Sequence, residues 1–181
     1  VWTLPTGAKV IANEIDPRRR AAASALGLQA YELDAEFIDD LLPEHLIPDI
    51  VLANPPFSST GGRVKNNSLE FGFRHIESAL RRLKKGGRFA VILCESGSPS
   101  SRNGNRFWEY LSLEIRVNAS IELPGREFYS NGTSVKTTLI IGTKSLSIDA
   151  PLSSELAAAP HIVARSVEDA FEKAISLNFR F

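Results

Sequence analysis

The stretch Asp-Ile-Val-Leu-Ala-Asn-Pro-Pro-Phe, residues 49–57, decides the fold of this chain. Its first half contains an uninterrupted apolar run, which is typical of a strand covered on both faces. Pro55 and Pro56 must end that strand, because proline has no N–H for the ladder and its ring fixes φ. A buried strand that stops at a polar and aromatic turn predicts a functional site at the carboxyl edge of an α/β sheet.

Short apolar runs alternate with helical patterns on both sides of this stretch, which predicts an α/β fold with a mostly parallel, twisted sheet. Asp16 followed by Pro17 predicts a helix start, with Asp16 as N-cap. Apolar residues at alternating steps of four and three predict another helix over 69–83. The remaining elements are expected as strands at 9–13, 29–33 and 88–93, helical stretches at 36–42, 107–113 and 167–177, and a C-terminal antiparallel hairpin of 117–123 and 135–143.

Composition limits the function classes. Lys and Arg together number 21, as do Asp and Glu, so net charge gives no argument for a nucleic-acid partner, although a local basic face remains compatible with one. The single cysteine, Cys94, excludes an internal disulfide and fits a cytoplasmic protein. No run approaches the roughly 18 apolar residues of a membrane span. No Cys/His cluster has metal-ligand spacing, so no metal is expected.

Asn-Pro-Pro-Phe after the strand at 49–53 resembles the catalytic motif of the S-adenosylmethionine-dependent amino-methyltransferases. The order of elements over roughly residues 8–144 is similar to the Rossmann-like fold of that family. The resemblance implies a DNA adenine N6-methyltransferase of the EC 2.1.1 class. It further implies S-adenosyl-L-methionine as the cofactor and double-stranded DNA with a flipped adenine as the partner.

The resemblance implies a catalytic role for Asn54, Pro55, Pro56 and Phe57. The side-chain oxygen of Asn54 and the carbonyl of Pro55 would accept hydrogen bonds from the adenine amine. Phe57 would stack on the flipped base, and Phe128, in the loop of the last hairpin, would help to hold it. The alternative is a strand-ending turn whose aromatic residue packs into the core.

The family also places two acids on the adenosine part of its cofactor. Glu14, at the end of the first expected strand, corresponds to the acid that accepts from both ribose hydroxyls. Asp34, after the second strand, takes the position that contacts the adenine amine of the cofactor, with Glu32 and Glu36 as neighbouring candidates. The alternative for Glu14 is a solvated loop acid.

A closer resemblance rests on Asn-Pro-Pro-Phe-Ser, the Gly-Gly-Arg-Val at 61–64, the helix that carries His75 and the run at 79–83. Together they are similar to the methylase half of strawberry-notch-like methylase–helicase antirestriction proteins of phages and plasmids. This resemblance implies a helicase domain in the same parent chain.

The family has a first strand and a glycine-rich loop before the position of Glu14, at the centre of its sheet. Residues 1–8 supply neither, so we expect an N-terminally truncated chain that lacks the loop for the cofactor's methionine moiety. Residues 1–145 would form a partial methyltransferase catalytic domain. Residues 146–181 would form a linker or bridge helix toward a further domain.

Two alternative functions remain open. Asn-Pro-Pro-Phe also fits methyltransferases that act on RNA or on glutamine in proteins. The missing glycine-rich loop fits a non-catalytic, methyltransferase-like module that binds nucleic acid or scaffolds a larger assembly.

Overall fold

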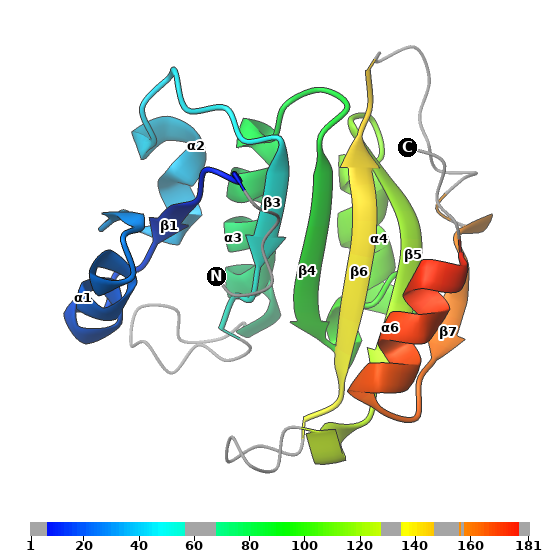
Figure 1. The fold of residues 1–181 in the computed structure, drawn as a ribbon. Coiled ribbons are helices and arrows are strands. Elements are labelled where there is room, and N and C mark those ends of the chain that lie inside the picture. The colour runs from blue at the N-terminus through cyan, green and yellow to red at the C-terminus, as the bar shows by residue number, and fades with distance from the viewer. Residues whose placement is uncertain (1–6, 57–67, 128–134, 147–155, 157, 178–181) are drawn as a thin grey trace.

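Two separate sheets carry the fold in the computed structural model, which describes residues 7–56, 68–127, 135–146, 156 and 158–177. The first sheet pairs β1 with β2, and the second has the order β3-β4-β6-β5-β7 (Figure 1). The expected α/β fold with a C-terminal antiparallel hairpin is confirmed. The mixed character of the second sheet comes from β6, which is antiparallel to both of its neighbours.

The elements fall close to the ranges that the sequence predicts. The strands are β1 (Ile11–Asn13), β2 (Gln29–Tyr31), β3 (Ile50–Ala53), β4 (Arg88–Cys94), β5 (Ile115–Leu123), β6 (Thr137–Lys144) and β7 (His161–Val163). The helices are α1 (Pro17–Ala25), α2 (Ile38–Leu41), α3 (Ser68–Arg82), α4 (Arg102–Leu111) and α6 (Val167–Ser176), with 3-10 turns η1 (Ala35–Phe37) and η2 (Glu95–Gly97).

Helix starts follow local capping chemistry. Asp16 caps α1 as expected, because its side chain accepts from the N–H groups of Arg18 and Arg19. The hydrogen bond from the Arg19 N–H is the main reason that the pKa of Asp16 is lowered. The prediction for α4 was wrong by five residues at its start, because Ser101 caps the helix with its Oγ 3.0 Å from the Gly104 nitrogen.

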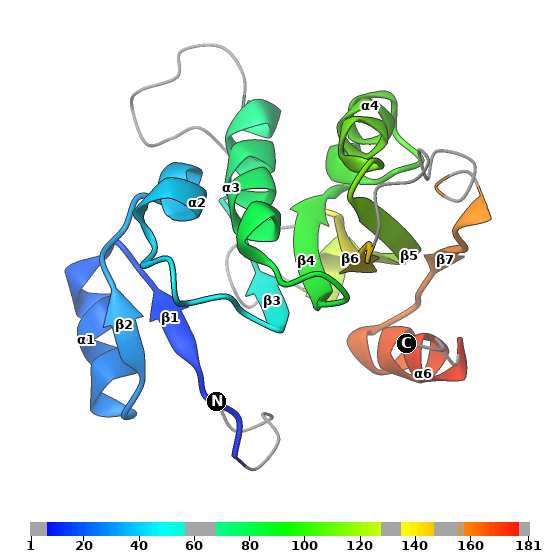
Figure 2. The ribbon, with the colours of Figure 1, turned by 90° about the horizontal axis from the view of Figure 1, so that it is seen from above.

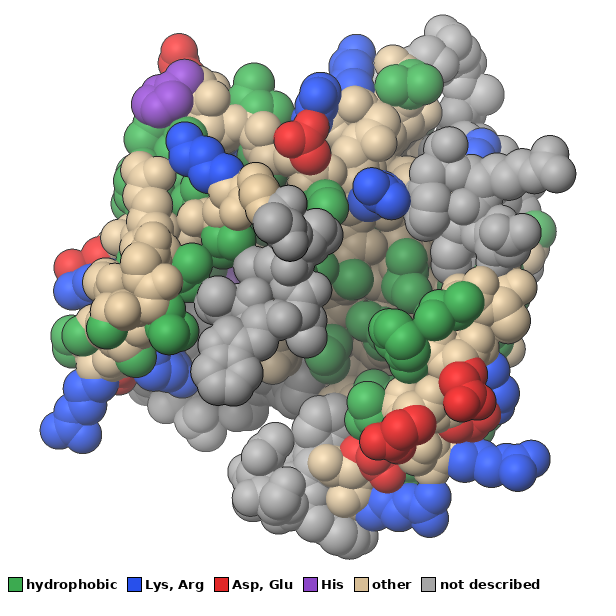
Figure 3. Space-filling view, in the orientation of Figure 1, with side chains coloured by type: hydrophobic (Ala, Val, Ile, Leu, Met, Phe, Trp, Pro, Cys, Tyr) green, Lys and Arg blue, Asp and Glu red, His purple; other side chains and the backbone are tan. Residues whose placement is uncertain are grey.

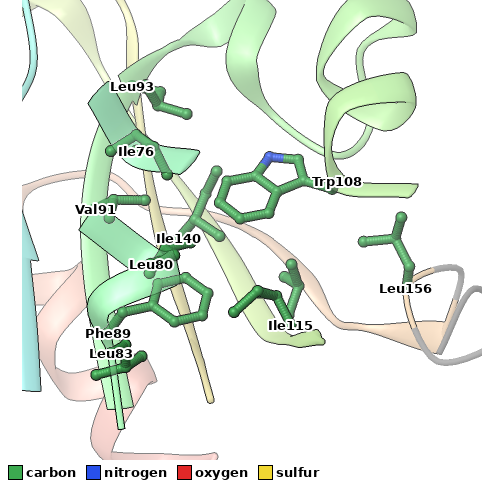
Figure 4. Packing of buried hydrophobic residues seen from close by; sticks show 11 residues of the cluster. Ile76, Leu80, Leu83, Phe89, Val91, Leu93, Trp108, Ile115, Ile140 and Leu156 are labelled. Carbon is green, nitrogen blue, oxygen red and sulfur yellow. The ribbon is translucent and has the colours of Figure 1, made fainter. Parts of the chain in front are cut away.

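Helices α3 and α4 lie on one face of the large sheet (Figure 2). The face of α3 that carries Ile76, Leu80 and Leu83 is buried with alternate residues of β4, and Trp108 of α4 lies beside them (Figure 4). Trp108 is only 1% exposed, and its indole N–H donates to the Gly97 carbonyl at 3.0 Å. This cluster comprises Ile76, Leu80, Leu83, Phe89, Val91, Leu93, Trp108, Ile115, Val117, Ile140 and Leu156.

On the opposite face, the described elements cover only part of the sheet. Ala170 of α6 packs on β5, in a second cluster with Ile121, Leu123 and Ala164. Strand β7 extends the same sheet by pairing in parallel with β5. The described part of residues 146–181 therefore packs on the domain, while the role of this segment as a bridge to a further domain stays a prediction.

The small sheet is attached to the large one through α3. The Ser78 hydroxyl accepts from the Asp39 N–H at 3.0 Å and donates to the Asp39 carboxylate at 2.7 Å. The Arg82 guanidinium donates to the carbonyls of Pro43 at 2.7 Å and Leu46 at 2.9 Å. Hydrogen bonds from α3 thus hold the segment that follows β2.

Candidate active site at the carboxyl ends of the strands

Glu14 lies immediately after β1, and its backbone N–H continues the ladder to the Tyr31 carbonyl at 3.0 Å. Its side chain is 27% exposed and is held by two groups. One carboxylate oxygen accepts from the Asp16 N–H at 2.9 Å, and the other lies 3.0 Å from Nε of Arg19. Because Arg19 is largely exposed, the pair is a weak surface interaction that a ligand hydroxyl can displace.

Asn13 joins the ends of β1 and β2, a role that the sequence analysis missed. Its amide nitrogen donates to the Leu33 carbonyl at 3.0 Å, and its amide oxygen accepts from the Leu33 N–H at 2.9 Å. These two bonds fix the backbone between Glu14 and Asp34. A polar residue at the end of a strand, directly before a candidate acid, is the sequence signal that would have identified it.

Asp34 begins η1, and its side chain accepts from the Glu36 N–H at 3.1 Å. His75 of α3 lies close enough to this turn for Glu36 and Asp34 to act on it electrostatically. Burial lowers the pKa of His75, and the two carboxylates oppose that shift. The loop that carries the second candidate acid is therefore packed against α3, while Asp34 itself stays half-buried.

The turn after β3 presents Asn54 to solvent and buries Pro55. Gly72 of α3 lies against this turn: a Cβ at that position would be 3.4 Å from the Pro56 carbonyl oxygen and 3.9 Å from Cγ of Pro55. Helix α3 therefore packs against the proline turn, and Asn54 extends from a backbone that this contact holds in place. Phe57 and Phe128, the two residues predicted to hold the base, lie outside the described residues.

A charged cluster occupies the same edge of the large sheet, beyond β4. Lys136 lies 3.3 Å from the carboxylate of Glu122 and 3.7 Å from that of Glu95. The hydrogen bond to Glu122, together with the charge of Glu95, raises the pKa of Lys136. No local sequence pattern marks these residues, because they meet only when β4, β5 and β6 are aligned.

The structure places the described candidate residues after the ends of strands, but on two separate sheets. Glu14 and Asp34 follow β1 and β2, and Asn54 follows β3. Within the described ranges, β1 pairs with β2 and β3 pairs with β4, and no pairing joins β1 to β3. The described residues contain no group of three or more Cys, His, Asp or Glu side chains that could hold a metal ion. No described helix is long and apolar enough to cross a membrane.

No protein-family model and no curated protein matches the sequence. Solved structures do match. A Listeria monocytogenes protein described as a class I S-adenosylmethionine-dependent methyltransferase aligns with a TM-score of 0.59 at 15% identity, over 92% of this chain and 54% of its own. A type I restriction enzyme modification subunit from Vibrio vulnificus aligns with a TM-score of 0.57 at 18% identity, over 75% of this chain and 32% of its own.

The M protein of the type I restriction enzyme EcoKI aligns with a TM-score of 0.55 at 24% identity, over 74% of this chain and 30% of its own. The chain thus spans about a third of the length of these modification subunits. The identities are low, so the likeness concerns the arrangement of the backbone. The chain has the fold of the S-adenosylmethionine-dependent methyltransferases.

Proposed function

We propose that this chain is part of the catalytic domain of an S-adenosylmethionine-dependent methyltransferase that acts on N6 of adenine in DNA. The observation that carries the proposal is the turn after β3. Asn54 is exposed on a backbone that Gly72 supports, at the carboxyl edge where α/β sheets bind their ligands. The similarity to type I restriction modification subunits supports DNA as the substrate class.

Asn54 and Pro55 orient the acceptor nitrogen in this proposal. The Asn54 side-chain oxygen and the Pro55 carbonyl accept the two amine hydrogens, which fixes the direction of the nitrogen lone pair. When bound, the cofactor supplies an electrophilic methyl group. The contribution of the chain is then mainly positioning, which by itself accounts for large accelerations when reacting atoms are held in line. Phe57 and Phe128 stack on and hold the base.

Glu14 and Asp34 bind the adenosine part of the cofactor. A carboxylate accepts from hydroxyl and amine donors, and that of Glu14 is partly exposed at the strand end. Its bond from the Asp16 N–H orients the carboxylate and leaves capacity for further donors. Arg19 must move away from Glu14 before a ribose can bind there, and an exposed arginine does so at a small cost in free energy.

The test is transfer of a labelled methyl group to DNA, RNA and protein by the longest natural protein that contains this chain. Asn54→Ala is expected to reduce transfer to DNA by on the order of 100-fold, because the amine loses its orientation. Asn103→Ala, an exposed asparagine on α4, is the matched control and should retain the activity. Transfer at the wild-type rate by Asn54→Ala would contradict the role assigned to Asn54. Labelling of RNA alone, or of protein alone, would show that DNA is not the substrate.

A non-catalytic module is the second candidate, favoured by the separation of the two sheets between β1 and β3. It predicts DNA binding that does not respond to S-adenosylhomocysteine or to Asn54→Ala. Calorimetric titration of the chain with S-adenosylhomocysteine, beside a form extended upstream by roughly 30 residues, about one βα unit, separates the candidates. Binding by either form supports the enzyme, and binding by neither supports the module.

The larger context belongs to the proposal as well. The single cysteine suggests a cytoplasmic location, and the sequence resemblance suggests a helicase domain in the same parent chain. A role in restriction–modification or antirestriction is supported by the resemblance and by the likeness to type I modification subunits. Sequencing of the parent gene, followed by assay of helicase activity in its product, tests the helicase.

A further inference from the structure

Among the residues that the structure describes, no helix covers the face of β3 and β4 opposite α3 and α4, which we call the open face. Figure 2 shows α6 beneath the far side of the sheet, with no helix in colour beneath these two strands. Ile50 and Leu52 point to this side and are 51% and 68% exposed. Ile92 of β4 is half-buried on the same side, because its neighbours Val91 and Leu93 face the main core. Parallel strands are normally covered on both faces, so exposed apolar residues on β3 are suited to contact with a partner.

Helix α6 adds a second apolar surface beside the open strands. Val167, Phe171 and Ile175 repeat every four residues, and Phe171 and Ile175 are 67% and 63% exposed. The core-facing side of the helix is made by Ala170 and Ala174, so the larger side chains are not needed for packing within the domain. Exposed apolar patches of this kind mark binding surfaces.

Two acidic side chains lie beside this stripe on α6. Glu168 and Glu172 directly follow Val167 and Phe171 and are exposed. The basic residue of the helix is engaged elsewhere, because Lys173 bonds to Asp169 at 2.8 Å and to the Val163 carbonyl at 3.0 Å. Figure 3 shows hydrophobic surface on the sheet and on α6, with acidic side chains along the outer side of the helix and basic side chains beyond them.

We propose that α6 and the open face of β3 and β4 bind an amphipathic α-helix of a partner protein, with Lys or Arg residues beside its apolar stripe. A ridge of residues four apart packs into the grooves of another helix, and recognition of helices in apolar grooves relies on such anchors. The apolar stripe of the partner contacts Phe171, Ile175 and Leu52. Its basic flank faces Glu168 and Glu172. This inference is independent of the methyltransferase proposal.

Two synthetic peptides of about five helical turns test the proposal with the complete 181-residue chain. Both carry leucines at helical i, i+3, i+4 and i+7 spacing, and one has lysines where the other has glutamates beside the stripe. Fluorescence anisotropy should show at least about tenfold tighter binding of the lysine peptide, a preference that decreases as salt is added. Equal binding of the two peptides would overturn the proposal.

Variants locate the binding site. Phe171→Glu with Ile175→Glu should abolish peptide binding, whereas Leu113→Glu, an exposed apolar position next to α4, should not change it. Glu168→Lys with Glu172→Lys should reverse the preference toward the glutamate peptide. Retained binding by the Phe171 and Ile175 double variant overturns the proposal. A second result would also overturn it: the chain shows no preference between the peptides, self-associates in sedimentation experiments, and becomes monomeric in the same double variant.

Discussion

The two sheets of this molecule differ in what holds them together. The five-stranded sheet is built on fully buried side chains, with Phe89 and Trp108 stacked at 6.0 Å between ring centroids. The small sheet has strands of three residues each, and no residue from 7 to 41 is buried. Side-chain hydrogen bonds from Asn13, Ser78 and Arg82 take the place of a core.

Because of this difference, one half of the candidate site is held firmly and the other half is held weakly. The turn that carries Asn54 lies on the well-packed sheet, where the backbone is fixed by burial. Glu14 and Asp34 lie on the weakly packed one, whose geometry depends on a few polar contacts. Regions with little apolar burial open at lower free energy than the core does. We therefore expect the cofactor half of the site to be the half that a ligand must order.

The largest expected effect tests the core of the five-stranded sheet. Trp108→Ala removes a buried ring and the hydrogen bond to Gly97, and should lower the free energy of unfolding by about 3–5 kcal/mol. Urea denaturation measures it. Leu113→Ala, at an exposed position, is the control and should cost less than about 1 kcal/mol. Equal effects of the two substitutions would show that the core assigned to this sheet is wrong.

The second test asks whether the two sheets unfold separately. Arg82→Ala removes the hydrogen bonds from α3 to the carbonyls of Pro43 and Leu46. The attachment of the small sheet to α3 should then be weaker by about 2 kcal/mol. Hydrogen exchange should accelerate in β1 and β2 while β4 keeps its protection. Arg106→Ala, an exposed arginine on α4, serves as control. Uniform acceleration in both sheets would mean that they unfold as one unit.

A smaller effect is expected within the candidate site. Asn13→Ala breaks both bonds to Leu33, which should cost about 1–2 kcal/mol locally. In a form that binds S-adenosylhomocysteine, affinity should fall by roughly tenfold, the equivalent of 1.4 kcal/mol. Calorimetry measures the affinity. An unchanged affinity, with faster exchange in β1 and β2, would make Asn13 a structural residue only.

The smallest expected effect is a pH dependence. Burial lowers the pKa of His75 below its ordinary value of 6.5, so the unfolded chain takes up a proton first as the pH falls. The contribution to stability is complete above pH 6.5 and is lost as the pH falls from 6.5 toward the pKa of the folded state. Urea midpoints measured across this window should decline in the wild type and decline less in His75→Gln. Identical slopes would exclude His75 as the cause.

Much of the fold was predictable because the signals are local. The caps at Asp16 and Pro17, the four-and-three spacing of α3 and the proline stop after β3 depend on neighbouring residues only. Strand β7 was not predicted, because three residues carry little pattern and their position is set by pairing with β5, about 40 residues away. The early start of α4 was missed because serine is common in loops as well as at helix caps.

The candidate site was predictable in part for the same reason. Asn54 was proposed from the motif that ends its strand, and Glu14 and Asp34 from the family resemblance together with their places after strands. The structure places all three after strands, while their roles stay predictions. The roles of Asn13, Arg82 and Lys136 were not found, since each bonds to residues that are distant in sequence. Phe57 and Phe128 remain predictions.

Local sequence patterns specified the order of the strands and helices apart from β7, the cap at Asp16 and the proline turn that exposes Asn54. Each of these depends on backbone restrictions or on periodic burial, which act over a few residues. The division of the strands into two sheets, the contacts of α3 with both, and the apolar face of β3 and β4 that no described helix covers came from the tertiary structure. Strand pairing and helix packing are decided by contacts between distant segments, and a local pattern does not specify which segments meet.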